Sequence, residues 1–391
     1  MNQRYTEQEL FLRRTSGAAL PGKDQFTLID SFCGAGGLSL GFSEELGHSF
    51  HPVWANDLDK SSTETYSKNL KVDSQVGGIQ QILRDDPGQI PPATVVLGGP
   101  PCQGFSLLNR NRSNDTRKAL WQPFLEIVRI SGARVFVMEN VPQILRSREF
   151  QEISSAAGEL GFRLASANLC AANYGVPQLR WRAFIIGARD HDPKRVFPPV
   201  KTHAKPKDSP VRVFFNGQGP FVEKPAAWRT VRDAIGDLPP PEGTTIRDDP
   251  PPFDLHFGRA PTELSRKRYR VVPDEGMNRF DLQERAPDLT PRCWLEKKTG
   301  GTDLFGRLWW DRPAYTIRTE FFKPEKGRYL HPSEHRPITH REAARFQSFP
   351  DTFHFVGKKI EIARQIGNAV PPDLAARIAD AVLAILLSSG E

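Results

Sequence analysis

Cys102 stands in an unusual run, Gly98-Gly99-Pro100-Pro101-Cys102-Gln103-Gly104-Phe105-Ser106, directly after the apolar segment 94–97. A short β-branched segment that ends in two glycines predicts a buried strand followed by a loop. The two prolines stiffen the backbone just before the thiol, and neither suits a central strand. The thiol is therefore expected at the carboxyl end of a strand, where open α/β sheets carry their active sites. A cysteine that only fills a hydrophobic core does not need a stiff Pro-Pro segment at a strand end. The position of Cys102 therefore favours a chemical role for its thiol.

Two more reactive groups lie beside apolar runs. Glu139 follows the run 135–138, and Arg180 and Arg182 come just before the run 183–186. A carboxylic acid in such a place can donate a proton to a bound ring, and arginines two apart on an extended segment point to the same side. Taken alone, the glutamate is more often structural and the Arg-x-Arg pattern carries little information.

A glycine-rich turn after the first predicted strand indicates a nucleotide site. The run is Phe32-Cys33-Gly34-Ala35-Gly36-Gly37, and Asp57 lies 20 residues beyond Gly37 at the end of the second predicted strand. Glycines let the backbone approach a nucleotide, and the acidic group can take a ribose hydroxyl. The spacing alone fits NAD, FAD or S-adenosylmethionine, but the run departs from GxGxxG, which weakens the case for a pyrophosphate. A turn without a ligand is the remaining alternative.

These runs together resemble the motifs of the DNA (cytosine-5) methyltransferases, in the family's order along most of the chain. The segments 336–350 and 365–371 resemble the family's last motifs. The resemblance implies that Cys102 attacks carbon 6 of cytosine and that Glu139 protonates ring nitrogen 3. It assigns Arg182 to the cytosine carbonyl oxygen and to orienting the acid, with Arg180 beside it. The implied target is a cytosine flipped out of duplex DNA.

The same resemblance implies S-adenosylmethionine as the cofactor. Phe32 is expected against the adenine, with Gly34 and Gly36 flanking the methionine part and Asp57 binding the ribose. The other expected contacts are Gly37, Leu58, Ile79, Pro100, Leu120, Asn368 and Val370. One departure is visible, because Gly78 stands where the family commonly has an acidic residue that holds the adenine amino group.

Basic residues cluster beside the nucleophile. The segment 107–118 carries Arg110, Arg112, Arg117 and Lys118 against one acidic residue, and the whole chain has a net charge of +7. Such a balance favours a polyanionic partner, and a loop that grips phosphates is preferred here to an ordinary solvated loop. By resemblance the loop from Gln103 to Lys118 closes over the flipped base, and Ser106 within it meets the DNA backbone.

Composition narrows the remaining classes. The chain is 38% hydrophobic, and no run approaches the length of a membrane span. The start lacks an apolar signal-peptide core. The four cysteines form no CxxC pair, so neither a metal site nor a disulfide framework is indicated. We expect a cytoplasmic protein with its thiols reduced.

In the first half, predicted strands at 26–31, 52–56, 94–97, 135–138 and 183–186 alternate with predicted helices at 38–46, 62–69 and 121–130. This alternation predicts a Rossmann-like α/β sheet, mostly parallel, beside a smaller irregular lobe. Fourteen of the 34 prolines fall between Pro193 and Pro261, which excludes long helices and central strands there. Its aromatic residues favour a recognition lobe over a disordered linker. The expected division is an N-terminal extension (1–25), a catalytic cofactor-binding domain (26–190), a target-recognition domain (191–335) and C-terminal motifs that complete the catalytic domain (336–391).

Two other functions stay open at this point. A methyltransferase of the same fold acting on tRNA is one, although the long lobe and the Gln-Gly-Phe-Ser continuation favour DNA. A DNA-binding homologue without catalysis is the other, although Cys102, Glu139 and Arg182 argue against it. The expected partner is double-stranded DNA, with a cognate restriction endonuclease as a functional partner.

Overall fold

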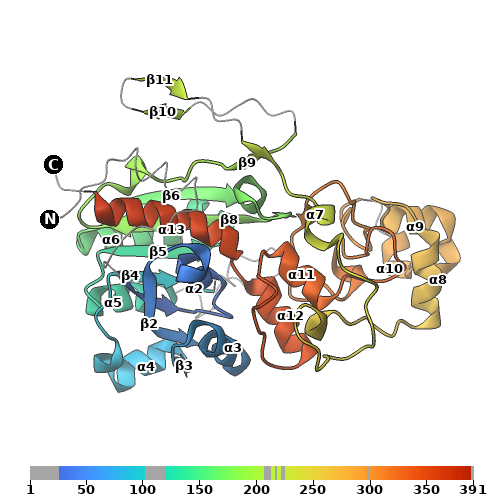
Figure 1. Ribbon diagram of the computed structural model, residues 1–391, viewed down its shortest axis with the longest axis horizontal. Helices are drawn as coiled ribbons and strands as arrows, with labels where there is room; N and C mark the ends of the chain where they lie inside the picture. The colour runs from blue at the N-terminus through green and yellow to red at the C-terminus, as the bar shows by residue number, and fades with distance from the viewer. Residues whose placement is uncertain are drawn as a thin grey trace.

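A seven-stranded sheet forms the larger part of the molecule, and a lobe of short helices lies beside it (Figure 1). The computed structural model describes residues 26–101, 120–206, 213–215, 218–221, 225–296 and 299–388. The sheet has the order β3-β2-β1-β4-β5-β8-β6. Its strands are β1 (Phe26–Ser31), β2 (Phe50–Asp57), β3 (Ser74–Val76), β4 (Val95–Gly98), β5 (Val135–Asn140), β6 (Arg163–Cys170) and β8 (Trp181–Ala188).

Six of these strands run in the same direction, and β8 alone among the seven runs antiparallel to its neighbours β5 and β6. The expected α/β class and the mostly parallel sheet are confirmed. The predicted strand 26–31 and helix 121–130 coincide with β1 and with α5 (Trp121–Ile130). The carboxyl ends of β1, β2, β4 and β5 meet at one edge of the sheet, which is where an open α/β sheet binds its ligands.

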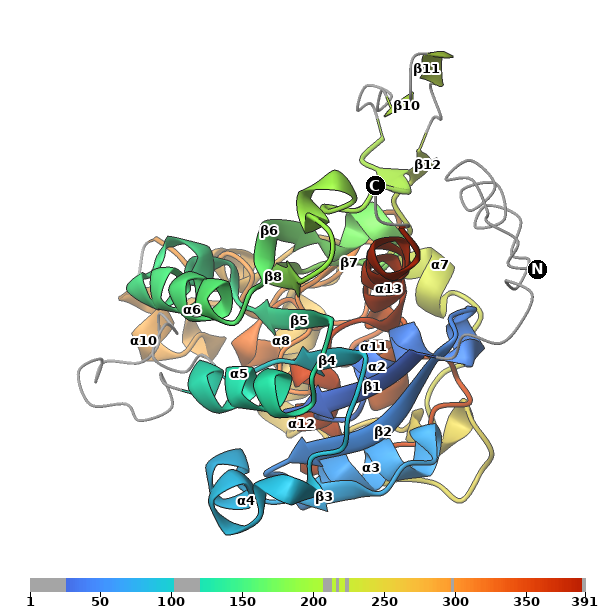
Figure 2. The ribbon, with the colours of Figure 1, turned by 90° about the vertical axis from the view of Figure 1, so that its left-hand side faces the viewer.

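Helices cover both faces of the sheet (Figure 2). Val95 and Leu97 face α2 (Gly37–Phe42) and α13 (Pro372–Leu387), whereas Val96 between them faces the opposite layer. This alternation follows from the two-residue period of a strand. The opposite layer consists of α4 (Ile79–Asp85), α5 and α6 (Arg148–Glu159), while α3 (Lys60–Leu70) packs beside β2 and β3.

One predicted helix is divided in the structure. The segment 38–46 was expected to form a single helix, but α2 ends at Phe42 and a separate 3-10 turn, η1 (Glu44–Leu46), follows. Ser43 between them is extended, and its N–H and hydroxyl both donate to the Leu40 carbonyl. A serine that satisfies a helix-end carbonyl in this way competes with continuation of the helix.

The lobe is built from short elements around a small core, as its proline content predicts. Its described elements are α7 (Val231–Ile235), α8 (Glu263–Val271), α9 (Arg279–Arg285), α10 (Arg292–Leu295) and β13 (Ala314–Tyr315). The preceding short strands lie on the side of the sheet domain (Figure 1): β9 (His203–Ala204), β10 (Val213–Phe215), β11 (Gln218–Phe221) and β12 (Ala226–Ala227). Tyr269, Leu282, Phe305 and Leu330 lie in that core and are almost fully buried. Packing of this kind rules out a disordered linker for 225–296 and 299–335.

The last helices join the lobe to the sheet. α11 (His340–Phe346) and α12 (Lys359–Asn368) share a core with lobe residues such as Ile317 and with Leu40 of α2, and α13 then returns to the face of the sheet. Thr339 and Glu342 cap α11 reciprocally, which fixes where it begins. No helix in the described part of the chain is long and apolar enough to cross a membrane.

Candidate active site

The glycine-rich turn after β1 is fastened by the carboxylate at the end of β2. Asp57 Oδ2 accepts a hydrogen bond from the Gly34 N–H at 2.9 Å, and its Oδ1 accepts one from the Asp59 N–H at 2.9 Å. Phe32, Gly34 and Gly36 have φ values of 59°, 52° and 93°, so three residues of the turn adopt the left-handed region. Burial raises the pKa of Asp57, and those two N–H donors oppose the shift. The sequence-predicted Asp57 and glycines therefore form one structural unit.

Apolar surface is available on one side of this unit. Leu58 directly follows Asp57 and is 76% exposed, which is unusual for a leucine beside a sheet edge and suits an adenine ring. Ile79 is only 2% exposed and belongs to the core under α5, so a ring could meet no more than its edge. Gly78 caps α4 without a side-chain hydrogen bond, and an added Cβ there would meet nothing within 4 Å.

The joint between α12 and α13 closes against the glycine-rich turn. A Cβ on Gly37 would lie 2.4 Å from the Val370 carbonyl oxygen, so only glycine permits this approach. Val370 is buried and Asn368 is exposed. Gln365 of α12 accepts from the Thr65 hydroxyl at 2.8 Å, which fastens the joint to α3. Residues more than 300 positions apart are thus brought to the same edge of the sheet.

The predicted acid and one predicted arginine form an ion pair at the next strand ends. Arg182 Nε lies 2.8 Å from Glu139 Oε1, and the side chains are 19% and 12% exposed. Burial raises the pKa of Glu139, and the positive charges of Arg182 and Arg180 oppose this rise. A raised pKa favours the protonated form of the carboxyl group, which is the form that a general acid needs.

The chain that leads to Cys102 passes directly over this pair. A Cβ on Gly99 would lie 3.2 Å from Glu139 Oε2, and Asn140 Nδ2 donates to the Pro100 carbonyl at 3.1 Å. Asn140 therefore fixes the rigid segment Pro100–Pro101 relative to the acid. Sequence reasoning gave Asn140 no role, although its place directly after Glu139 was a signal that could have shown it.

Arg180 is placed differently from Arg182. It is fully buried, and its guanidinium donates to the backbone carbonyls of Ile317 and Gly367, each at 3.0 Å. Gln178 makes a parallel link, donating to Gln347 Oε1 at 2.8 Å. The side chains of Gln178 and Arg180 thus connect the segment just before β8 to the lobe and to the C-terminal helices. These contacts indicate a positioning role for Arg180 and leave Arg182 as the arginine that faces the acid.

A buried polar chain lies under the glycine-rich turn, and sequence reasoning missed it. Ser39 donates to Asp30 Oδ2 at 2.5 Å, and Tyr66 donates to the Ser39 hydroxyl at 2.9 Å. Burial raises the pKa of Asp30 to about 7. The polar residue in an otherwise apolar β1 was the available signal.

Several predicted site residues lie outside the described part of the chain. They are Cys102, Ser106, Arg110, Arg112 and Arg117. Leu120 is described at the start of α5, where it packs partly buried against the core, and Pro100 is buried. The described residues contain no group of His, Cys, Asp or Glu side chains that could hold a metal ion.

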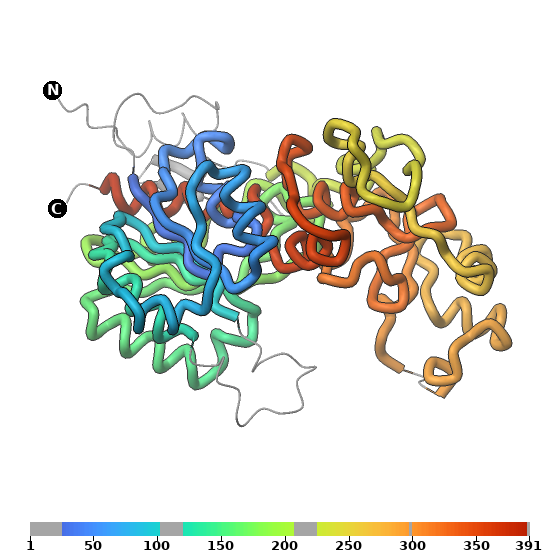
Figure 3. The backbone as a smooth tube through the Cα atoms, turned by 90° about the horizontal axis from the view of Figure 1, so that it is seen from below, coloured from blue at the N-terminus to red at the C-terminus, as the bar shows by residue number. Residues whose placement is uncertain are grey.

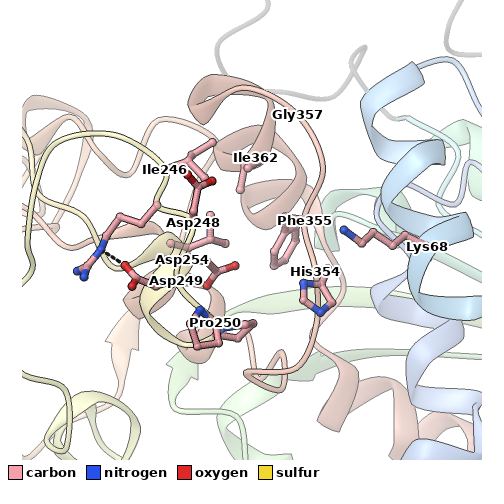
Figure 4. A pocket seen from close by; sticks show the side chains of 13 residues that line it. Lys68, Ile246, Asp248, Asp249, Pro250, Asp254, His354, Phe355, Gly357 and Ile362 are labelled. Atoms are coloured by element: carbon pink, nitrogen blue, oxygen red, sulfur yellow. Dashed lines mark hydrogen bonds and ion pairs between the residues drawn. The ribbon is translucent and has the colours of Figure 1, made fainter.

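A separate hollow lies on another part of the surface (Figure 4). Asp248, Asp249 and Asp254 of the lobe line one side of it, facing Lys68 and His354. It encloses about 550 Å³, but none of the predicted catalytic or cofactor residues lines it. The candidate active site is therefore the sheet edge and not this hollow.

Comparison with known proteins decides the family. The model of the C-5 cytosine-specific DNA methylases matches residues 26–384. The chain belongs to this family. The prediction of a DNA (cytosine-5) methyltransferase is thereby confirmed.

The methyltransferase is similar to enzymes of bacterial restriction-modification systems. It is 32% identical to the Type II methyltransferase M.AgeI of Thalassovita gelatinovora, over 90% of this chain and 98% of the relative. It is also 32% identical to M1.HphI of Haemophilus parahaemolyticus, over 91% and 86% of the two chains. In fold it resembles a DNA modification methyltransferase encoded in an E. coli prophage, with a TM-score of 0.64 at 23% identity, covering 93% of this methyltransferase and all of that chain.

Proposed function

We propose that this DNA (cytosine-5) methyltransferase uses Cys102, Glu139 and Arg182 on a flipped cytosine, with S-adenosylmethionine as the methyl donor. The observation that carries the proposal is the Glu139–Arg182 pair at 2.8 Å, in contact range of the segment that leads to Cys102. Glu139 and Arg182 come from the end of β5 and the start of β8, and Cys102 follows the end of β4 in the sequence.

Carbon 5 of cytosine is a poor nucleophile, so the enzyme must first interrupt the aromatic ring. The Cys102 thiolate adds to carbon 6 while the Glu139 carboxyl gives its proton to nitrogen 3, which leaves carbon 5 as an enamine carbon. Arg182 donates to the cytosine carbonyl oxygen and holds the Glu139 carboxyl in place. Carbon 5 takes the methyl group, with S-adenosylhomocysteine as the leaving group, and then loses its proton to water. The thiolate leaves carbon 6, and nitrogen 3 returns its proton to the Glu139 carboxylate.

The residues around the glycine-rich turn fit S-adenosylmethionine, which supplies an electrophilic methyl group. Asp57 retains lone pairs for a ribose hydroxyl, and the exposed Leu58 offers an apolar face to adenine. Phe32, Gly34, Gly36 and Gly37 form the turn. The close approach of Val370 to Gly37 completes the cradle, with Asn368 exposed beside it and Pro100, Leu120 and Ile79 at its periphery.

The remaining assignments concern the DNA and the cell. Ser106, Arg110, Arg112 and Arg117 are proposed to contact the DNA backbone, and residues 191–335 to select the target site. Residues 26–190 and 336–391 are proposed to form the catalytic domain, preceded by the extension 1–25. A cognate restriction endonuclease is proposed as the functional partner of this enzyme in a bacterial cytoplasm.

The proposal is tested by transfer of a tritiated methyl group from S-adenosylmethionine to duplex DNA, with tRNA as a parallel substrate. We expect labelled DNA, loss of labelling in Cys102→Ser, and wild-type labelling in Cys293→Ser, since Cys293 is an exposed cysteine in the lobe. Cofactor titration of Asp57→Ala should show affinity about tenfold weaker. Labelling of tRNA alone would overturn the DNA assignment, and an active Cys102→Ser would overturn the nucleophile.

A further inference from the structure

Four consecutive exposed residues in the lobe have their carbonyl groups fixed from inside the protein. Arg279 donates to the carbonyls of Thr299, Gly300 and Gly301 at 3.4, 2.6 and 3.2 Å. Arg328 donates to the Thr302 carbonyl at 3.1 Å. All four loop residues are exposed, whereas the two arginines are only 1% and 4% exposed.

Burying a guanidinium group is costly unless its N–H donors find acceptors. Here several of the N–H donors of these two arginines use the carbonyl groups of an exposed loop as their acceptors. Arg279 also donates to the Trp294 carbonyl at the end of α10, and Arg328 to the Arg307 carbonyl at 2.7 Å. The loop is therefore held to the lobe core on one side.

The outward side of the loop consists of hydrogen-bond donors. Within the part of the chain that the structure describes, the N–H groups of Gly300, Gly301 and Thr302 have no hydrogen-bond partner. Gly300 and Gly301 have φ values of 73° and 63°, and an added Cβ on Gly300 would meet nothing within 4 Å. Another molecule can thus approach this backbone closely. The threonine hydroxyls add two further groups that can donate.

The loop follows α10, which extends from the lobe on the same side of the molecule as α5 and α6 of the sheet domain. Figure 2 shows α10 at the same edge as these two helices, and in Figure 3 the orange segment and the green segment of the sheet domain project in the same direction. DNA that lies along this side of the molecule would therefore meet both parts.

We propose that the loop 299–302 reads the target site by donating hydrogen bonds to the acceptor edge of a base pair. This inference rests on the proposed function. In the major groove a guanine offers two adjacent acceptors, N7 and O6, which suit neighbouring N–H and hydroxyl donors. Arg279 and Arg328 act as positioning residues, because their contacts fix the loop from behind.

The test compares the sequences methylated by wild-type enzyme and by variants, read by bisulfite sequencing of a random duplex DNA library. Thr299→Ala/Thr302→Ala should relax the preference at one or two positions of the site and leave the others unchanged. Gly300→Asn keeps a residue that tolerates the left-handed region but fills the approach, and it should lower kcat/KM on the preferred site about tenfold or more.

The lobe supplies a matched control for the second variant. Gly243 also has a positive φ, 67°, and open space around an added Cβ, but it lies in the loop before the hollow lined by Asp248. Gly243→Asn should retain the wild-type site and rate, and both asparagine variants should unfold at the wild-type temperature. Thr244→Ala/Thr245→Ala is the corresponding control for the threonines.

Each other outcome has a definite meaning. An unchanged site and rate in all loop variants overturns the inference. Weaker binding that is uniform across sequences, with a smaller salt dependence and the same site, assigns the loop to a phosphate and also overturns it. If wild-type enzyme methylates no cytosine, the proposed function fails instead.

Discussion

The balance of charges around the Glu139 carboxyl group is expected to set the pH range of the proposed reaction. In the proposed mechanism Glu139 carries a proton when cytosine binds, so activity should fall as the pH rises through its pKa. Burial raises that pKa, whereas Arg182 and Arg180 lower it. The ion pair with Arg182 thus orients the Glu139 carboxyl group, but it also lowers its pKa and so favours loss of the proton.

Replacing Arg182 by Gln removes the nearest opposing charge, so the pKa of Glu139 should rise further. The fall of single-turnover activity on the alkaline side, the alkaline limb of its pH profile, should then occur at higher pH. The maximal rate should fall at least tenfold, because the cytosine carbonyl oxygen loses its hydrogen-bond donor. Arg134→Gln, which removes the cation of the exposed pair with Asp190, is the control and should leave the limb in place. A limb that stays or moves to lower pH in Arg182→Gln contradicts the assignment of Glu139.

Asp30 makes a second pH-dependent contribution, in this case to stability. Its pKa is about 7 in the folded protein and 3.8 in the unfolded reference, so between these values the folded state binds more protons. Stability should therefore fall as the pH rises from about 4 towards 7. In Asp30→Asn this dependence should largely vanish, and at pH 8 the variant should be more stable by on the order of 2 kcal/mol. Parallel pH profiles for wild type and variant in thermal unfolding would refute this.

At the scale of elements, the approach of the α12–α13 joint to the glycine-rich turn is expected to decide cofactor binding. Gly37→Ala places a methyl group 2.4 Å from the Val370 carbonyl, so the joint must move away. We expect S-adenosylmethionine affinity to fall about tenfold or more and the unfolding temperature to drop by several degrees. Gly158 of α6 has open space, so Gly158→Ala should bind normally and unfold at the same or a higher temperature. Normal affinity in Gly37→Ala would remove the joint from the cofactor site.

The start of α4 offers a gain of function. Gly78→Asp adds a carboxylate where space is open and where the helix lacks a side-chain cap. If the adenine amino group lies there without a partner, calorimetry should show affinity about five- to tenfold tighter. Gly78→Ser caps the helix equally but offers no carboxylate, so it separates the two effects. Equal affinity in both variants would place the adenine elsewhere.

Sequence patterns predicted elements well where local signals were strong. The apolar run of β1 and the amphipathic α5 were bounded correctly. β6 was missed because it is an edge strand with exposed polar residues such as Arg163 and Ser166. Arg180 was grouped with the catalytic residues because a sequence pattern cannot show that its donors are satisfied by the Ile317 and Gly367 carbonyls. Long-range contacts of this kind become visible only in the folded chain.

At the scale of the molecule, one domain carries the chemistry and the other is proposed to select the DNA, and the C-terminal helices hold the two together. Gln347 donates to the Ile366 carbonyl at 2.5 Å, and Arg180 links the β8 start to the same region. The cofactor turn, the acid and the lobe therefore share one rigid junction. This arrangement brings residues from distant parts of the chain to one proposed active site.

The most direct test of this account is a trapping experiment with duplex DNA carrying 5-fluorocytosine at the target cytosine. Once methylated, carbon 5 bears fluorine in place of the proton that must leave, so the Cys102 thioether persists. We predict a complex that survives denaturation, forms only with S-adenosylmethionine present, and is absent in Cys102→Ser. A complex that persists in Cys102→Ser, or one that forms with fluorinated RNA but not with DNA, would contradict the central claim.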